Sequence, residues 1–174
     1  MSSVTVASLN RISCERLRTL LLTQHTQPGE EKVVVVDVPS RLNKQDPDHI
    51  GGHIKSSRHV PSGSLDYTAA ELARQLKGAE KVVFHCLLSQ QRGPSAALRY
   101  QMERERLFGR GSTVTAGGTK EEEGGEGREG GEEGEVKMQE VLVLDGGFAG
   151  WQAKYGNDER LTENYNKELW EAEY

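Results

Sequence analysis

The chain has 174 residues, the length of a single domain, and contains two cysteines and five histidines. It has no run of about eighteen apolar residues that could cross a membrane, and its first residues lack the basic and apolar pattern of a signal peptide. Two cysteines and scattered histidines provide neither a disulfide framework nor the paired spacing of a zinc site. We therefore expect a cytoplasmic or nuclear protein that has no membrane partner and binds no metal.

The net charge of −5 originates in one segment. Residues 119–135 hold eight glutamates against two basic residues, so the rest of the chain carries 20 basic and 19 acidic side chains. Half of the 20 glycines fall between residues 109 and 134. A segment of glycine and glutamate cannot bury enough apolar surface to order itself. We therefore predict a single domain over 1–174 that carries a disordered surface insert at about 109–137.

Signals for helices and strands alternate along the rest of the chain. In chain order they predict a helix at 13–23, a strand at 33–36, a helix at 68–78, a strand at 81–84, a helix at 95–102, a strand at 141–144 and helical spacing of apolar residues in the tail at 157–174. The start of the helix at 68–78 follows from the capping-box spacing of Thr68 and Glu71. Alternation of this kind is typical of an α/β fold, with a parallel sheet covered by helices on both faces.

A loop between the strand at 81–84 and the helix at 95–102 contains a cysteine and an arginine separated by five residues, Cys86 and Arg92. Such a loop lies at the positive end of a helix dipole, where an anion binds. Its backbone N–H groups would face a tetrahedral oxyanion, and the planar guanidinium of Arg92 would hold two of the oxygens. The predicted oxyanion-binding residues are Leu87, Leu88, Ser89, Gln90, Gln91 and Arg92.

Cys86 is the candidate nucleophile of this loop. A cysteine reacts as its thiolate, which a helix N-terminus or a nearby cation favours. Attack on phosphorus would give a phosphocysteine that water then hydrolyses, while the loop donors stabilise the charge of the transition state. The alternative is that Cys86 is a buried structural residue, since a cysteine and an arginine at this spacing also arise by chance.

Four segments of the chain, in this order, resemble the rhodanese-fold superfamily. They are the strand and acid at 33–37, Gly-Gly-His-Ile at 51–54, the loop at 86–94, and Leu-Asp-Gly-Gly-Phe-Ala-Gly-Trp at 144–151. Within the superfamily, the chain is most similar to the cell-division-cycle mitotic-inducer phosphatases and to their small fungal relatives, which include arsenate reductases. The resemblance implies a rhodanese-like three-layer fold, with Cys86 as nucleophile and Arg92 as oxyanion clamp.

Loop length separates the two branches of this superfamily. The sulfurtransferase branch has a loop of six residues, which is too tight for phosphate, whereas the phosphatase branch has seven. The stretch from Cys86 through Arg92 has seven residues. The resemblance therefore implies a cysteine-based protein phosphatase, specific for phosphotyrosine or of dual specificity, that could also reduce arsenate.

The chain departs from the mitotic phosphatases at three positions. Leu87 and Gln91 replace two glutamates of their loop, so the group that protonates the leaving oxygen is not identified. Val38 replaces the cysteine that could trap the oxidised nucleophile as a disulfide. The second thiol, Cys14, lies in the predicted helix at 13–23, where we interpret it as a surface or packing residue. An arsenate reductase of this kind would therefore draw electrons from glutathione or glutaredoxin.

Asp37, His85 and His53 are predicted to support the loop. As in the family that the chain resembles, His53 is expected to follow a tight turn and to bind backbone. His85 is expected to order the loop by hydrogen bonding. Asp37 is expected either to pair with Arg41 or to act as a general acid, which would require a raised pKa. Other candidate proton donors are Asp46, Asp48 and His49.

Three alternatives remain open. A sulfurtransferase would carry a persulfide on Cys86, an arsenate reductase would bind arsenate in the same loop, and an idle phosphate-binding module would explain the missing loop acids. The expected substrate is a phosphorylated protein, a small aryl phosphate or arsenate. We expect a monomer with no nucleic acid partner, and no cofactor apart from glutathione or glutaredoxin as a reductant.

Overall fold

The computed structural model describes residues 5–27, 32–39, 51–114 and 138–173. Outside these ranges lie the candidate proton donors Asp46, Asp48 and His49, the predicted pairing of Asp37 with Arg41, and most of the predicted insert. Among the described helices, none has the length and apolar character that crossing a membrane requires.

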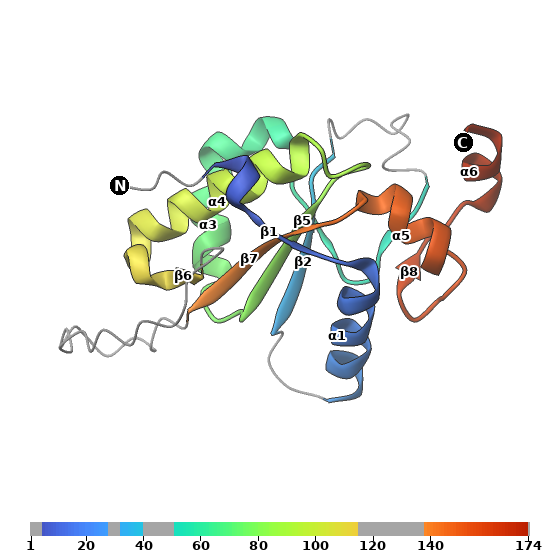
Figure 1. Ribbon diagram of the computed structural model, residues 1–174, viewed down its shortest axis with the longest axis horizontal. Coiled ribbons are helices and arrows are strands. Elements are labelled where there is room, and N and C mark those ends of the chain that lie inside the picture. Colours follow the sequence, from blue (N-terminus) through green and yellow to red (C-terminus); the bar gives the residue numbers. More distant parts are fainter. Residues whose placement is uncertain (1–4, 28–31, 40–50, 115–137, 174) are drawn as a thin grey trace.

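A parallel β-sheet forms the centre of the fold (Figure 1). Its strands lie in the order β1-β7-β5-β2-β4, and β6 pairs with the start of β7 on the same side as β1. A separate antiparallel pair is formed by β3 and β8. The strands are β1 (Asn10–Ile12), β2 (Val33–Asp37), β3 (His53–Ile54), β4 (Arg58–His59), β5 (Lys81–His85), β6 (Thr113–Val114), β7 (Gln139–Leu144) and β8 (Thr162–Glu163).

Helices cover both faces of the sheet, α3 and α4 on one face and α1 and α5 on the other (Figure 1). Val34 and Val36 of β2 pack with α3 and α4, whereas Val33 and Val35 pack with α1 and α5, because successive strand side chains point to opposite faces. The predicted three-layer α/β fold is therefore confirmed. The helices are α1 (Cys14–Thr26), α3 (Leu65–Gln75), α4 (Arg92–Phe108), α5 (Gly147–Tyr155) and α6 (Lys167–Glu173), and the 3₁₀ turns are η1 (Val6–Ser8), η2 (Ser62–Ser64) and η3 (Arg110–Ser112).

The predicted starts of two helices are wrong. α3 begins three residues before Thr68, and the Thr68 hydroxyl donates to the carbonyl of Ser64 one turn earlier, so it cannot cap the helix. α4 begins at Arg92 rather than at residue 95. Pro94 belongs to its first turn, where the missing N–H of proline breaks no hydrogen bond. The helix N-terminus therefore lies closer to Cys86 than the sequence indicated.

The predicted start of the insert is also displaced. Gly109, with φ of 93°, follows the last residue of α4, and the chain continues through η3 into β6. Thr113 and Val114 pair with the start of β7, so residues 109–114 continue the folded domain through η3 and β6. The remainder of the predicted insert, 115–137, lies outside the described residues.

The tail packs back on the body of the domain, because Leu161 and Trp170 are buried against the core of α1 and α5. Its first part is not helical, however. It forms a turn followed by β8, which pairs with β3, and only α6 is a helix.

The carboxyl ends of β2, β4 and β5 meet at one edge of the sheet. The strand register places Asp37 beside His59 of β4 on one side and beside His85 of β5 on the other. The loop that contains Cys86 leaves β5 at this edge, which is where open parallel sheets bind ligands.

Candidate active site

The predicted oxyanion loop encloses a pocket of about 280 Å³ between β5 and α4. Cys86 and Arg92 both line this pocket, so the structure brings the two predicted catalytic residues together. Cys86 is only 4% exposed, yet it lines this opening. Ser89 is fully buried and is the one residue from Cys86 through Arg92 that does not line it. The other lining residues are Leu87, Leu88, Gln90 and Gln91.

The first turn of α5 fixes the start of the loop. The amide of Phe148 donates to the Cys86 carbonyl at 3.0 Å, and the amide of Ala149 donates to the Leu87 carbonyl at 2.9 Å. In a planar trans peptide the N–H group points opposite to the C=O group. The amides of Leu87 and Leu88 therefore point away from α5.

Two further contacts orient the rest of the loop in the same way. Both terminal nitrogens of Arg11 lie 3.4 Å from the carbonyl oxygen of Ser89, and the amide of Ser95 donates to the Gln91 carbonyl at 2.9 Å. The amides of Gln90 and Arg92 are thereby turned away from these supports. Ser89 itself takes a left-handed conformation, with φ of 54°. Four carbonyls of the loop are thus bound by groups outside the pocket, and the N–H groups of the same four peptide units point toward the pocket.

Gly147 allows α5 to approach the loop this closely. Its φ is 59°, and a Cβ atom there would lie 2.5 Å from the Leu87 carbonyl oxygen and 2.7 Å from that of Cys86. No side chain fits in this position. This glycine in the motif at 144–151 is therefore what lets the chain pass close to the loop.

Asp37 and two histidines lie beneath the loop. The buried Asp37 carboxylate accepts from His59 Nδ1 at 3.1 Å, and its other oxygen lies 3.8 Å from His85 Nδ1. The same His85 nitrogen is 3.3 Å from the Cys86 carbonyl oxygen. A continuous line of polar contacts therefore joins the edge strand β4 to the peptide of the candidate nucleophile, and the supporting roles predicted for His85 and Asp37 gain defined partners.

The charge of Asp37 does not suit a general acid. Burial acts to raise the pKa of this carboxyl, but His85, and then the hydrogen bond and charge of His59, outweigh it and hold the pKa below its ordinary value. The same hydrogen bond raises the pKa of His59 above its ordinary value. Asp37 is therefore a carboxylate at neutral pH, and the alternative in which it protonates a leaving group is disfavoured.

His53 does not bind backbone as predicted. Its Nε2 lies 2.9 Å from Oε2 of Glu163, across the β3–β8 pair, because β8 of the tail brings an acid opposite it. The His53 ring meets the His59 ring edge-on, with centroids 5.0 Å apart. His53 therefore links the tail to the polar residues beneath the loop.

Sequence reasoning missed Arg11, His59 and Glu163. Each lies in a short strand of two or three residues, which gives no periodic signal, and each reaches the site only through sheet pairing. Within the described residues, no group of three or more His, Cys, Asp or Glu is arranged to hold a metal ion.

Comparison with known proteins defines the class of this fold and site. The family model described as the Rhodanese-like domain matches residues 22–154. The chain belongs to this family. Over 98% of its length it is 33% identical to the CDC25-like phosphatase YCH1 of Saccharomyces cerevisiae, of which it covers 99%.

One further relative and one solved structure support the same class of enzyme. Arsenate reductase 2.2 of Oryza sativa is 34% identical over 71% of the chain and 72% of that protein. A solved structure of Ygr203w, a yeast protein tyrosine phosphatase of the Rhodanese family, superposes with a TM-score of 0.63 and 31% identity, covering 97% of this chain and 99% of that one. The predicted resemblance is confirmed, and the chain is an enzyme of the cysteine-based phosphatase or arsenate reductase type.

Gly147→Ala should damage the loop specifically. The new Cβ atom would push the Cys86 and Leu87 carbonyls away from α5, and the left-handed backbone would cost about 1–2 kcal/mol in addition. We expect the affinity for tungstate, measured by calorimetry, to fall at least tenfold. Gly150→Ala is the control, because its Cβ would lie 4.0 Å from its nearest neighbours. Equal tungstate affinity in the two variants would contradict this account of the loop.

His59→Asn should destabilise the protein in a pH-dependent manner. The raised pKa of His59 gives stability that is present below about pH 6.5 and is lost as the pH rises through the folded-state pKa. The lowered pKa of Asp37 gives stability that is lost only as the pH falls below its ordinary 3.8. Since the His59 side chain is one-third exposed, we expect an extra loss of only about 1 kcal/mol at pH 5.5 compared with pH 9, measured by urea unfolding. A pH-independent loss for His59→Asn would refute the pairing with Asp37.

Proposed function

We propose that this protein hydrolyses phosphomonoesters as a cysteine-dependent phosphatase, through a phosphocysteine intermediate. The observation that carries the proposal is the orientation of the loop. Four of its carbonyls are tied to α5, Arg11 and α4, so that amides face a pocket bounded by Cys86 and Arg92. Inward amides at a helix N-terminus suit a tetrahedral dianion.

In the proposed reaction the sulfur of Cys86 attacks phosphorus. A sulfur–phosphorus bond forms while the bond from phosphorus to the leaving oxygen breaks, and the leaving group departs as an alkoxide or phenoxide that takes up a proton. Water then attacks phosphorus, the sulfur–phosphorus bond breaks, and the thiolate returns with release of phosphate. The loop amides and Arg92 stabilise the equatorial oxygens in both steps.

The lining of the pocket suggests which esters react most readily. None of the described residues that line it is acidic, so no carboxyl group there stands ready to protonate the leaving oxygen. Phosphate esters of phenols need this assistance least, because a phenolate is a weaker base than an alkoxide. We infer that phosphotyrosine and small aryl phosphates are the preferred substrates. The enzyme would work in a reducing compartment such as the cytoplasm or nucleus, where Cys86 stays a thiol.

Cys86→Ser should abolish turnover of p-nitrophenyl phosphate, with a loss of about 10³-fold or more in kcat, because a hydroxyl is a far weaker nucleophile. Arg92→Lys should lose about 10²-fold, since a lysine cannot replace the planar pair of hydrogen bonds. Cys14→Ser, at the other thiol, should retain the wild-type rate. Equal rates for wild type and Cys86→Ser would reject the proposal, and tungstate binding by an inactive wild type would indicate a binding module instead.

Arsenate reduction is a second candidate function, favoured by the similarity to the rice arsenate reductase. Arsenate has the shape and charge of phosphate and would bind the same loop amides. Its reduction to arsenite needs two electrons, which two thiols supply when they join as a disulfide. Cys14 is buried at the start of α1, with Sγ 3.7 Å from the carbonyl oxygen of Asp145. We therefore propose glutathione or glutaredoxin, rather than Cys14, as the electron source.

Formation of arsenite from arsenate should accordingly require added glutathione, with or without glutaredoxin. The rate should be unchanged in Cys14→Ser and should vanish in Cys86→Ser, with arsenite measured by chromatography and mass spectrometry. A tenfold fall in Cys14→Ser would show that the buried thiol takes part and would overturn this assignment.

A further inference from the structure

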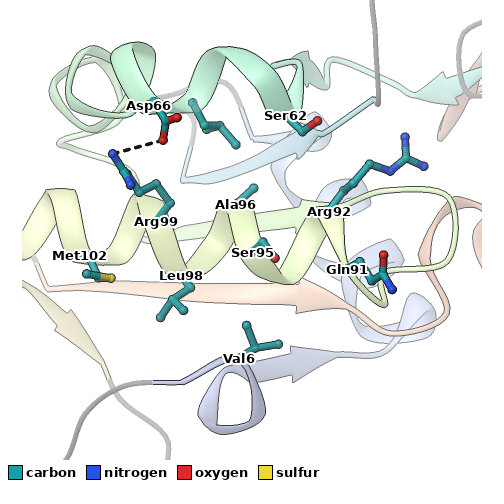
Figure 2. A pocket seen from close by; sticks show the side chains of 11 residues that line it. Val6, Ser62, Asp66, Gln91, Arg92, Ser95, Ala96, Leu98, Arg99 and Met102 are labelled. Atoms are coloured by element: carbon teal, nitrogen blue, oxygen red, sulfur yellow. Dashed lines mark ion pairs between the residues drawn. The ribbon is translucent and has the colours of Figure 1, made fainter.

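A larger hollow adjoins the loop pocket and follows α4 (Figure 2). We call it the α4 groove. It has a volume of about 470 Å³ and shares two lining residues, Gln91 and Arg92, with the pocket that contains Cys86. A ligand whose phosphate occupies the loop pocket can therefore extend directly into the α4 groove.

One face of α4 forms the floor of this groove. Ser95, Leu98 and Met102 follow one another at helical spacing and lie on the same side of the helix. Val6 of η1 lies beside this face, and Leu65 at the start of α3 also lines the groove. Figure 2 shows Gln91 and Arg92 at one end of the groove and Met102 at the other.

Exposed apolar side chains gather in these two hollows. The described residues include five large hydrophobic side chains that are exposed, and three of them line the groove or the loop pocket. Val6 is 37% exposed and Met102 is 56% exposed in the groove, and Leu88 is 47% exposed in the loop pocket. Apolar side chains that cluster at a concave surface mark a binding site, so the groove suits an apolar part of a ligand.

The length of the groove distinguishes between substrates. Arg92 and Met102 are ten positions apart, which is about 15 Å along a helix axis at 1.5 Å per residue. An extended peptide covers about 15 Å with four to five residues, at about 3.3 Å per residue. An arsenate or free phosphate ion would be held in the loop pocket and would make no use of the groove. The Asp66–Arg99 ion pair, 3.3 Å long, lines the groove and leaves no net charge from these two residues.

We propose that the α4 groove binds, in extended form, the peptide segment next to a phosphorylated residue and selects apolar side chains in that segment. The inference rests on the proposed phosphatase function and adds a substrate class to it, phosphopeptides with an apolar flank. The phosphate lies between Cys86 and Arg92, and the apolar side chains contact Val6, Leu98 and Met102.

The test compares pairs of phosphotyrosine peptides. The two members of a pair differ only in four residues on one side of the phosphotyrosine, which contain leucines in one peptide and are all serine in the other. One pair varies the N-terminal side and a second pair varies the C-terminal side. On one of the two sides, wild type should hydrolyse the leucine peptide with a kcat/KM at least tenfold higher than that of its serine counterpart. Met102→Glu should reduce this leucine-to-serine ratio to near one. Because the ratio is taken within one enzyme, a general loss of activity cancels. Met138→Glu is the matched control, since this methionine is also exposed but lines neither the groove nor the loop pocket. The leucine-to-serine ratio of this variant should equal that of wild type.

The two levels of the proposal fail in different ways. Absence of p-nitrophenyl phosphate hydrolysis by wild type would overturn the phosphatase function and this inference together. Hydrolysis of p-nitrophenyl phosphate without discrimination between the peptides, or a ratio that survives Met102→Glu, would overturn only the role of the α4 groove.

Discussion

The catalytic loop depends on two hydrogen bonds from the N-terminus of α5. These bonds hold the Cys86 and Leu87 carbonyls toward α5. Because each peptide is planar and trans, the N–H groups of Leu87 and Leu88 point to the opposite side, toward the pocket. The approach of α5 is possible only because Gly147 lacks a side chain. Two helix N-termini therefore serve the site in different ways. That of α4 faces the pocket, whereas that of α5 binds the backbone that builds it.

A second constraint acts from below the loop. Asp37, His59 and His85 come from three neighbouring strands at matching register, so the sheet itself sets their spacing. The buried carboxylate is stable there because two histidines offset its desolvation. His85 then contacts the carbonyl of Cys86, which α5 also binds, so that one peptide oxygen receives donors from two layers of the fold.

The parts of this structure that local signals encode were predictable from the sequence. The valine run of β2, the loop between β5 and α4, and the glycine-containing motif at the start of α5 each carry their information within a few residues, and each was located. The start of α3 was misplaced because Thr68 has the spacing of a capping box but bonds to Ser64 inside the helix. Arg11, His59 and Glu163 could not be found, since their positions at the site follow from pairing between distant short strands.

The placement of β6 defines a site where a second domain could be inserted into this protein. Its two residues pair with the first residues of β7, Thr113 with Gln139 and Val114 with Glu140, so the intervening chain leaves and returns at neighbouring points. Both points lie at the amino edge of the sheet, on the far side from Cys86. A fluorescent reporter whose own termini are adjacent could be spliced between them, where loop closure costs little and the catalytic loop is remote. The enzyme could then be followed in a living cell.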